Sequence, residues 1–261
     1  MPASFDETRL DVNGVDTAAL TAGAGEPLVF FHGGGVLEGA DCFLPLAERF
    51  RLVVPYHPGF GGSASDPSIS GIGGWVEHYV ELFELLGIGE LALVGHSLGG
   101  WLAAVFALDH GERVRRLVLA SPYGLDSPEH PIANLGAIPP EEVYSVLTND
   151  RSIFAGKVPM PLDEEFLAAR GLEGQSIGQV LPGPFDPTLA GRLSSLTTPT
   201  LLLWGDDDKV VPVEHFPLWE SALPNVESRI YPGRGHLLFW EDQAAVDAAL
   251  AFVTARRTIA S

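Results

Sequence analysis

The stretch Leu91-Ala92-Leu93-Val94-Gly95-His96-Ser97-Leu98-Gly99-Gly100 decides how this 261-residue chain folds. Its apolar start predicts a buried strand, and residues 98–110 have helical spacing, so Ser97 lies where a strand turns into a helix. Gly95 and Gly99 carry no Cβ, which lets strand and helix crowd together and lets the serine adopt a strained backbone. The turn therefore predicts an outward-pointing hydroxyl beside the free N–H groups that begin a helix.

Composition and charge narrow the kind of protein. Hydrophobic residues make up 46% of the chain, enough for a large core, and no apolar run approaches the roughly 20 residues that span a membrane. The net charge of -19 would repel the phosphates of nucleic acid and of anionic membranes. Cys42 is the only cysteine, which excludes an internal disulfide, and the first residues do not have the pattern of a signal peptide. We therefore expect a cytoplasmic protein that acts on a small molecule, and we find no sequence signal for its oligomeric state.

Strand and helix signals alternate along most of the chain. Residues 8–12 and 15–20 predict a β-hairpin, because Asn13-Gly14 between them supplies the positive φ angles of a two-residue turn. Further strands are expected at 28–31, 51–56, 91–96, 116–121, 199–204 and 227–231, and helices at 37–50, 75–86, 98–110, 213–222 and 242–256. This alternation predicts an α/β fold with a mostly parallel, twisted sheet and helices on both faces.

The alternation breaks between residues 122 and 196. Prolines and glycines are frequent there, and only 140–147 and 162–170 have helical spacing. A structureless loop of this length is improbable inside a compact domain, so we expect a small helical lid at 122–196, inserted after the sixth strand. The core domain would then comprise residues 1–121 and 197–261.

Ser97 needs a base and an orienting acid, because a serine alone is a poor nucleophile at neutral pH. Two loops near the C-terminus supply candidates. Residues 206–208 are three adjacent aspartates that follow a predicted strand, and His236 follows the next strand. The order along the chain is serine, aspartate, histidine.

Taken together, these motifs resemble the α/β-hydrolase fold family in its serine-nucleophile, lid-bearing, esterase-like form. The resemblance covers nearly the whole chain and is carried by Gly95-His96-Ser97-Leu98-Gly99, His32-Gly33-Gly34-Gly35, Gly205-x-x-Asp208 with Pro212, and Gly235-His236. It implies that Ser97 attacks an acyl carbon, that His236 transfers the proton and that Asp208 orients the imidazole. It also implies an oxyanion hole made by backbone N–H groups of Leu98, Gly34 and Gly35.

Other residues compete for these roles. Asp126 follows a predicted strand shortly after Ser121, where some members of this fold keep their acid. His57 lies in a glycine-rich loop, and we interpret it as a turn residue. We expect His96 to support the serine turn.

The resemblance leaves the substrate open. The sequence predicts no cofactor and no metal site, since it has neither a nucleotide-binding glycine motif nor closely spaced histidine ligands. An apolar substrate pocket is expected from Trp101, Tyr123, Phe154, Met160, Phe166, Phe185 and Phe239. The first interpretation is hydrolysis of a carboxylic ester, thioester or lactone of a hydrophobic small molecule through an acyl-enzyme. C–C bond hydrolases of the meta-cleavage type, hydroxynitrile lyases and ligand receptors on the same scaffold are the alternatives.

Overall fold

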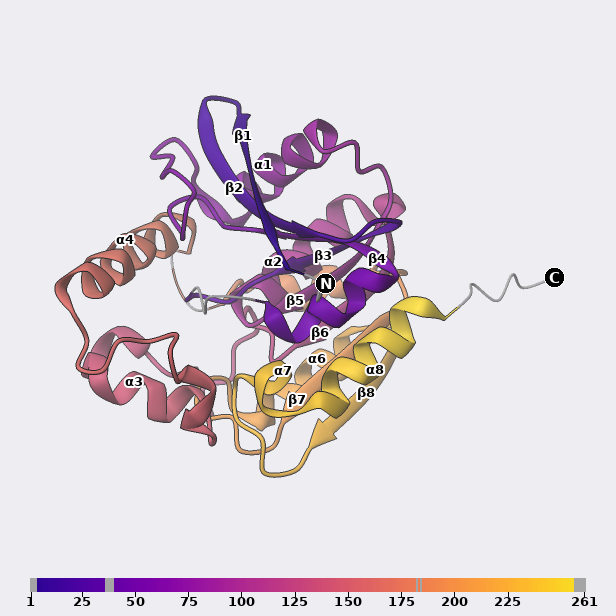
Figure 1. Cartoon of the computed structure of the whole chain (residues 1–261). Helices are drawn as coiled ribbons and strands as arrows, with labels where there is room; N and C mark the ends of the chain where they lie inside the picture. Colours follow the sequence, from indigo (N-terminus) through magenta and orange to yellow (C-terminus); the bar gives the residue numbers. More distant parts are fainter. Residues whose placement is uncertain (1–3, 36–39, 182, 184, 256–261) are drawn as a thin grey trace.

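The computed structural model describes residues 4–35, 40–181, 183 and 185–255. Eight strands form one sheet in the order β1-β2-β4-β3-β5-β6-β7-β8 (Figure 1). The strands are β1 (Asp6–Val12), β2 (Val15–Ala22), β3 (Glu26–Phe31), β4 (Phe50–Pro55), β5 (Leu91–His96), β6 (Val114–Ala120), β7 (Thr200–Gly205) and β8 (Val226–Tyr231). β2 pairs antiparallel with β1 and with β4, and every pairing from β4 to β8 is parallel. The predicted α/β fold with a mostly parallel sheet is confirmed.

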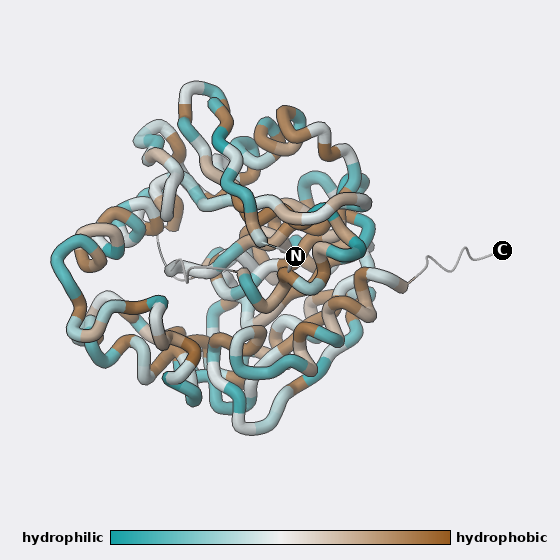
Figure 2. Tube along the Cα trace, in the orientation of Figure 1, coloured by the Kyte–Doolittle hydropathy of each residue, from teal (hydrophilic) through white to brown (hydrophobic). Residues whose placement is uncertain are grey.

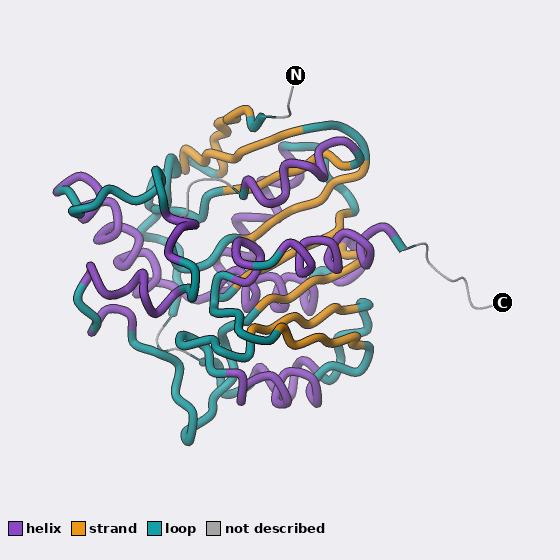
Figure 3. Tube along the Cα trace, turned by 60° about the horizontal axis from the view of Figure 1, so that its bottom comes forward, coloured by secondary structure: helices purple, strands orange, loops and turns teal. Residues whose placement is uncertain are grey.

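Helices cover both faces of the sheet (Figure 3). One face packs against α1 (Gly71–Leu85), α2 (Leu98–Asp109) and α6 (Phe216–Ala222), and the other against the 3-10 helix at Asp41–Glu48, α7 (Leu238–Glu241) and α8 (Gln243–Thr254). Neighbouring residues of the strands point to opposite faces, so Leu93 joins one apolar cluster and Val94 the other. Both faces are therefore buried, and the hydrophobic segments of the chain gather at its centre (Figure 2).

The β1–β2 hairpin forms as the sequence predicts. Val12 pairs with Val15, and Asn13 and Gly14 have φ angles of 54° and 88°. These positive values are those that a two-residue turn requires, and they explain the Asn-Gly pair.

Close approach of backbones shapes the serine turn. Ser97 lies between the end of β5 and the beginning of α2, with φ 57° and ψ -121°. A Cβ on Gly95 would lie 2.3 Å from the carbonyl oxygen of Gly99, and a Cβ on Gly99 would lie 2.2 Å from the carbonyl oxygen of Phe31. Both contacts are with backbone atoms, which cannot move aside, so glycine is required at each position.

In its described residues, the segment between β6 and β7 contains three α-helices, α3 (Pro140–Leu147), α4 (Glu164–Val180) and α5 (Leu189–Leu193), and two 3-10 helices at Leu135–Ala137 and Arg151–Phe154. Figure 1 shows α3 and α4 at one side of the molecule, apart from the helices that flank the sheet. α3 has the predicted bounds. α4 runs ten residues beyond its predicted end at 170, because Gly171, Gly174 and Gly178 weaken the helical signal of a segment that folds as a helix.

The helix expected at 37–50 differs from the prediction. Its described part is a 3-10 helix at Asp41–Glu48, and residues 37–39 lie outside the described part of the chain. Pro45 lies inside this element, where its missing N–H and its ring disfavour a regular α-helix.

Among the residues that the structure describes, none of the helices has both the length and the apolar character needed to cross a bilayer.

Gly99→Ala should lower the free energy of unfolding by about 3 kcal/mol or more, because the added methyl group overlaps backbone atoms of β3. Urea denaturation followed by circular dichroism measures the change. Gly73→Ala is the matched control, since a Cβ at Gly73 meets open space. Equal stability of the two variants would contradict the close approach.

Candidate active site

Ser97, His236 and Asp208 lie in one chain of hydrogen bonds. His236 Nε2 is 2.9 Å from Ser97 Oγ, and His236 Nδ1 is 2.8 Å from Asp208 Oδ2. A carboxylate only accepts, so Nδ1 donates to Asp208 and the lone pair of Nε2 faces the serine hydroxyl. The three side chains come from the loops after β5, β7 and β8, three parallel strands that end at the same edge of the sheet. This arrangement can take a proton from Ser97 and hold it on the imidazole.

Asp208 is buried and has two further partners. Its Oδ1 accepts hydrogen bonds of 2.9 Å from the backbone N–H groups of Val210 and Val211. Burial by itself raises the pKa of this carboxyl, but the charge and hydrogen bond of His236 and the two N–H groups outweigh it, so the pKa lies below its ordinary value. Asp208 is therefore ionised at neutral pH.

The structure separates Asp208 from the other carboxylates considered. Asp126 is exposed, and it is Asp208 that the fold brings to His236. Asp206 accepts a hydrogen bond of 2.5 Å from the N–H of Gly233, and Asp207 accepts one of 2.9 Å from the amide of Asn149. These two aspartates hold the loop after β7 rather than the imidazole.

His96 connects the serine turn to the loop that carries His236. Its Nε2–H donates to the carbonyl oxygen of His236 at 2.7 Å, and the two rings lie 4.7 Å apart. Burial, aided by the neighbouring charge of His236, lowers the pKa of His96 to about 3. The ring therefore stays neutral and fixes the distance between the two loops.

A second buried histidine pair supports the glycine loop. The backbone N–H of His57 donates to His32 Nε2 at 3.1 Å, so His32 carries its proton on Nδ1 and donates to the carbonyl of Gly33. His57 in turn donates from Nε2 to the carbonyl of His32 at 2.9 Å and accepts from the hydroxyl of Tyr79. His57, expected as a turn residue, is thus a fully buried support of this loop.

The glycine loop lies beside the serine. A Cβ on Gly33 would be 3.2 Å from Ser97 Cβ, and one on Gly34 would be 4.0 Å from Leu98 Cδ2. Gly34, Gly35 and Leu98 all line the same cavity as Ser97. The structure therefore brings the residues expected to hold an oxyanion to one place.

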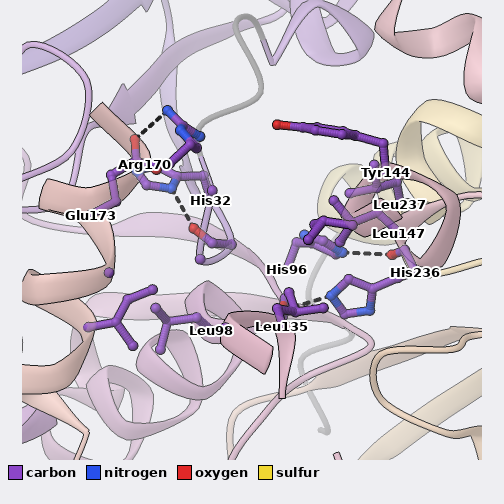
Figure 4. A pocket seen from close by; sticks show the side chains of 18 of the residues that line it. His32, His96, Leu98, Leu135, Tyr144, Leu147, Arg170, Glu173, His236 and Leu237 are labelled. Carbon is purple, nitrogen blue, oxygen red and sulfur yellow. Dashed lines mark hydrogen bonds and ion pairs between the residues drawn. The ribbon is translucent and has the colours of Figure 1, made fainter. Parts of the chain in front are cut away.

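The cavity has a volume of about 880 Å³ and lies between the core and the segment from β6 to β7 (Figure 4). Of the pocket residues predicted from sequence, Tyr123 and Phe166 line it. Its wall also includes Leu135, Tyr144, Leu147, Val158, Arg170, Glu173, Ile177, Leu237 and Trp240, which the prediction missed. Helical spacing was the available signal for part of this set, since Arg170, Glu173 and Ile177 follow one another on a face of α4.

The other five predicted pocket residues lie elsewhere. Trp101 is buried against Gly124, and Phe154 packs on Tyr144 behind the cavity wall with ring centroids 4.9 Å apart. Phe239 lies in the apolar cluster on the far face of the sheet, 5.0 Å from the ring of Phe43. Met160 is 52% exposed, and Phe185 forms a β-bridge with Gly124. Packing and surface exposure, rather than a ligand, account for these side chains.

Within the described residues, no three side chains of histidine, cysteine, aspartate or glutamate gather as metal ligands do.

The sequence is similar to that of known proteins over most of its length. A model described as "Alpha/beta hydrolase family" matches residues 28–249. The chain is 28% identical over 244 residues to 2-hydroxy-6-oxo-6-phenylhexa-2,4-dienoate hydrolase of Burkholderia cepacia, covering 84% of both chains.

Two solved structures are similar over nearly the whole chain. A membrane phospholipase A described as a bacterial virulence factor is 26% identical, with a TM-score of 0.80 over 96% of this chain and 87% of that one. A serine hydrolase involved in carbazole degradation is 28% identical, with a TM-score of 0.79 over 97% of this chain and 100% of that one.

Buried neutral histidines predict a loss of stability in mild acid. Burial lowers the pKa of His32 and His78 to about 4 and that of His96 to about 3, so the unfolded chain binds protons that the folded chain does not. The contribution of these neutral histidines to the free energy of unfolding is fully present above about pH 6.5. It is lost as pH falls, by up to about 1.4 kcal/mol per pH unit for each histidine. Urea denaturation at pH 7.5, 6.5 and 5.5 measures this slope.

His78→Gln should reduce that slope, because it removes one of the buried neutral histidines. His78 contacts Thr17 and lies outside the cavity, so the change does not alter the cavity wall. A free energy of unfolding that increases as the pH is lowered from 7.5 to 5.5 would contradict the neutral state of these rings.

Proposed function

The chain belongs to the alpha/beta hydrolase family, and we propose that it is a serine hydrolase that cleaves a carboxylic ester, or a related thioester or lactone, of a hydrophobic small molecule. The observation that carries the proposal is the Ser97–His236–Asp208 hydrogen-bond chain at the wall of a large, mainly apolar cavity. The reported similarity to a phospholipase, a protein named for ester hydrolysis, supports it.

The first half of the reaction forms an acyl-enzyme. Ser97 Oγ attacks the acyl carbon while His236 Nε2 takes the hydroxyl proton, which leaves a tetrahedral intermediate with a negative oxygen. Asp208, ionised and hydrogen-bonded to Nδ1, stabilises the imidazolium that forms. The bond to the leaving oxygen then breaks, and His236 gives that oxygen the proton.

The second half repeats these steps with water. The oxygen of a water molecule attacks the acyl carbon while His236 Nε2 takes a proton from that water. The bond to Ser97 Oγ then breaks, and Nε2 returns the proton to Ser97. The product is the free carboxylic acid. No other group is required to balance the reaction.

The negative oxygen needs donors that are already in place. The N–H of Leu98, at the beginning of α2, is the first, because helix N-termini favour negative charge. The N–H of Gly34 is the second and that of Gly35 an alternative, since this loop lies beside the serine turn. Loss of one such donor typically costs about 10² to 10³ in rate.

The segment 122–196 acts as the lid in this proposal. Its residues Tyr144, Phe166 and Ile177 line one side of the cavity, and Leu98 and His236 line the core side. An acyl or alcohol group held between them is removed from water, which strengthens the electrostatic interactions around the intermediate.

C–C bond hydrolysis of the meta-cleavage type is the second candidate, and the dienoate hydrolase of Burkholderia cepacia supports it. Both chemistries use the same serine, histidine and aspartate, so the substrate decides between them. Purified protein should be tested with p-nitrophenyl esters and with 2-hydroxy-6-oxo-6-phenylhexa-2,4-dienoate. We expect faster turnover of the esters, with kcat/KM rising from acetyl to hexanoyl chains; preferred turnover of the dienoate would replace the first proposal by the second.

Asp208→Asn should lower kcat for p-nitrophenyl hexanoate by about 10⁴-fold with the fold intact, because the amide favours the wrong imidazole tautomer. Ser97→Ala should remove the covalent route altogether. Asp126→Asn is the matched control and should leave kcat within about twofold of wild type, as an exposed charge away from the site.

If Asp126→Asn lowers kcat strongly and Asp208→Asn does not, Asp208 is not the residue that orients the imidazole. A single slow turnover with retained product in wild type would favour a ligand receptor.

A further inference from the structure

Glu173 is buried in the wall of the cavity and forms an ion pair with Arg170, which is partly exposed. Arg170 Nη2 is 2.6 Å from Glu173 Oε1, and the side chain of Glu173 is 3% exposed. Both residues line the cavity, and both lie on α4. They form the polar side of a cavity whose remaining wall is mostly apolar.

Stability does not explain this pair. Glu173 shares the buried face of α4 with Ser176 and Val180, where an apolar side chain of similar size would also pack. Taking the carboxylate of Glu173 out of water costs free energy, and an ion pair with a partly exposed arginine offsets only part of that cost. A role in recognition is the alternative reason to keep the carboxylate there.

The pair lies next to the glycine loop that follows β3. Arg170 Nη1 would be 3.5 Å from a Cβ on Gly35, and the charge of Arg170 helps burial to lower the pKa of His32. Figure 4 shows Arg170 and Glu173 on one side of the cavity, near His32, and Tyr144 and Leu237 on the other side. Ser97, Arg170 and Glu173 line the same cavity, so a long substrate bound at Ser97 can reach this pair.

Charges in the cavity are compensated. The other lysine or arginine in its described wall is Lys157, whose Nζ is 3.2 Å from Asp41. His32 and His96 are neutral at pH 7, and His236 faces Asp208. A carboxylate that enters the described cavity loses its hydration, and every lysine or arginine in the described wall already faces an anionic partner. Burial of such a carboxylate is therefore costly.

Building on the proposed hydrolase activity, we propose that Glu173 is a specificity-determining residue. By neutralising Arg170, it restricts the cavity to substrates whose buried part carries no carboxylate. Without Glu173, Arg170 would bind such a carboxylate, because guanidinium and carboxylate groups pair strongly when both are removed from water. The substrate class is thus a neutral ester, and acids such as dienoates are disfavoured.

Two esters that differ at one position test this inference. p-Nitrophenyl hexanoate ends in a methyl group, and the mono-p-nitrophenyl ester of hexanedioic acid carries a carboxylate in its place. The measured quantity is the ratio of kcat/KM for the anionic ester to kcat/KM for the neutral ester. We expect this ratio to be low in wild type. It should rise by about tenfold or more in Glu173→Gln, because Arg170 then pairs with the carboxylate of the anionic ester.

Three further variants make the result specific. Glu165→Gln removes the same charge from the exposed side of α4 and should leave the ratio within about twofold of wild type. Arg170→Gln combined with Glu173→Gln should lose the gain, because the attraction comes from Arg170. Glu173→Asp, a milder change that weakens the pair, should raise the ratio by a smaller factor and carries the test if Glu173→Gln does not fold.

The outcomes separate the two proposals. A wild type that hydrolyses neither ester overturns the ester hydrolase function itself. A wild type that hydrolyses p-nitrophenyl hexanoate, with a ratio unchanged in folded Glu173→Gln and Glu173→Asp, overturns the role of Glu173 and leaves the function standing. A gain that persists in the double variant would show that added space, and not Arg170, admits the anion.

Discussion

The contact of Gly99 with the carbonyl oxygen of Phe31 is the constraint on which the rest of the site depends. It lets α2 begin directly against the end of β3, so that Ser97 and the glycine loop after β3 lie side by side. Any Cβ at Gly99 would separate them. Because the loops after β7 and β8 end at the same edge of the sheet, Asp208 and His236 reach this point as well. The geometry of the site thus follows from how closely two backbones approach.

The same region shows how buried polar groups are held neutral or paired. His32, His57 and His96 are buried, and each hydrogen-bonds to the backbone of a neighbouring loop. Burial lowers their pKa values, so they support the loops without adding charge near the reacting serine. Asp208 is the charged group that burial alone would neutralise, and two N–H groups and His236 keep it ionised. Asp208 therefore places a negative charge beside the ring on which an imidazolium would form.

Local sequence rules were sufficient for the sheet and for the residues at its edge. Ser97 and Asp208 each follow an apolar strand, His236 follows β8, which mixes apolar and polar residues, and parallel strands bring the positions after them together. The cavity wall was less predictable, because it depends on how the segment between β6 and β7 packs onto the core. Phe154 and Tyr144 are neighbours in that segment, and only their packing decides that Tyr144 faces the cavity. Glu173 was not predicted for a related reason, because the glycines of α4 weaken the helical signal of the segment whose buried face carries it.

The central claim is that Ser97 is a nucleophile activated by His236. Incubation with a fluorophosphonate, followed by peptide mass spectrometry, tests it without knowledge of the natural substrate, because such reagents bond to activated serines. The account predicts one phosphonate adduct, on Ser97, formed at a rate that drops sharply in His236→Ala. Absence of an adduct in folded wild-type protein, or an adduct on another residue, would contradict it.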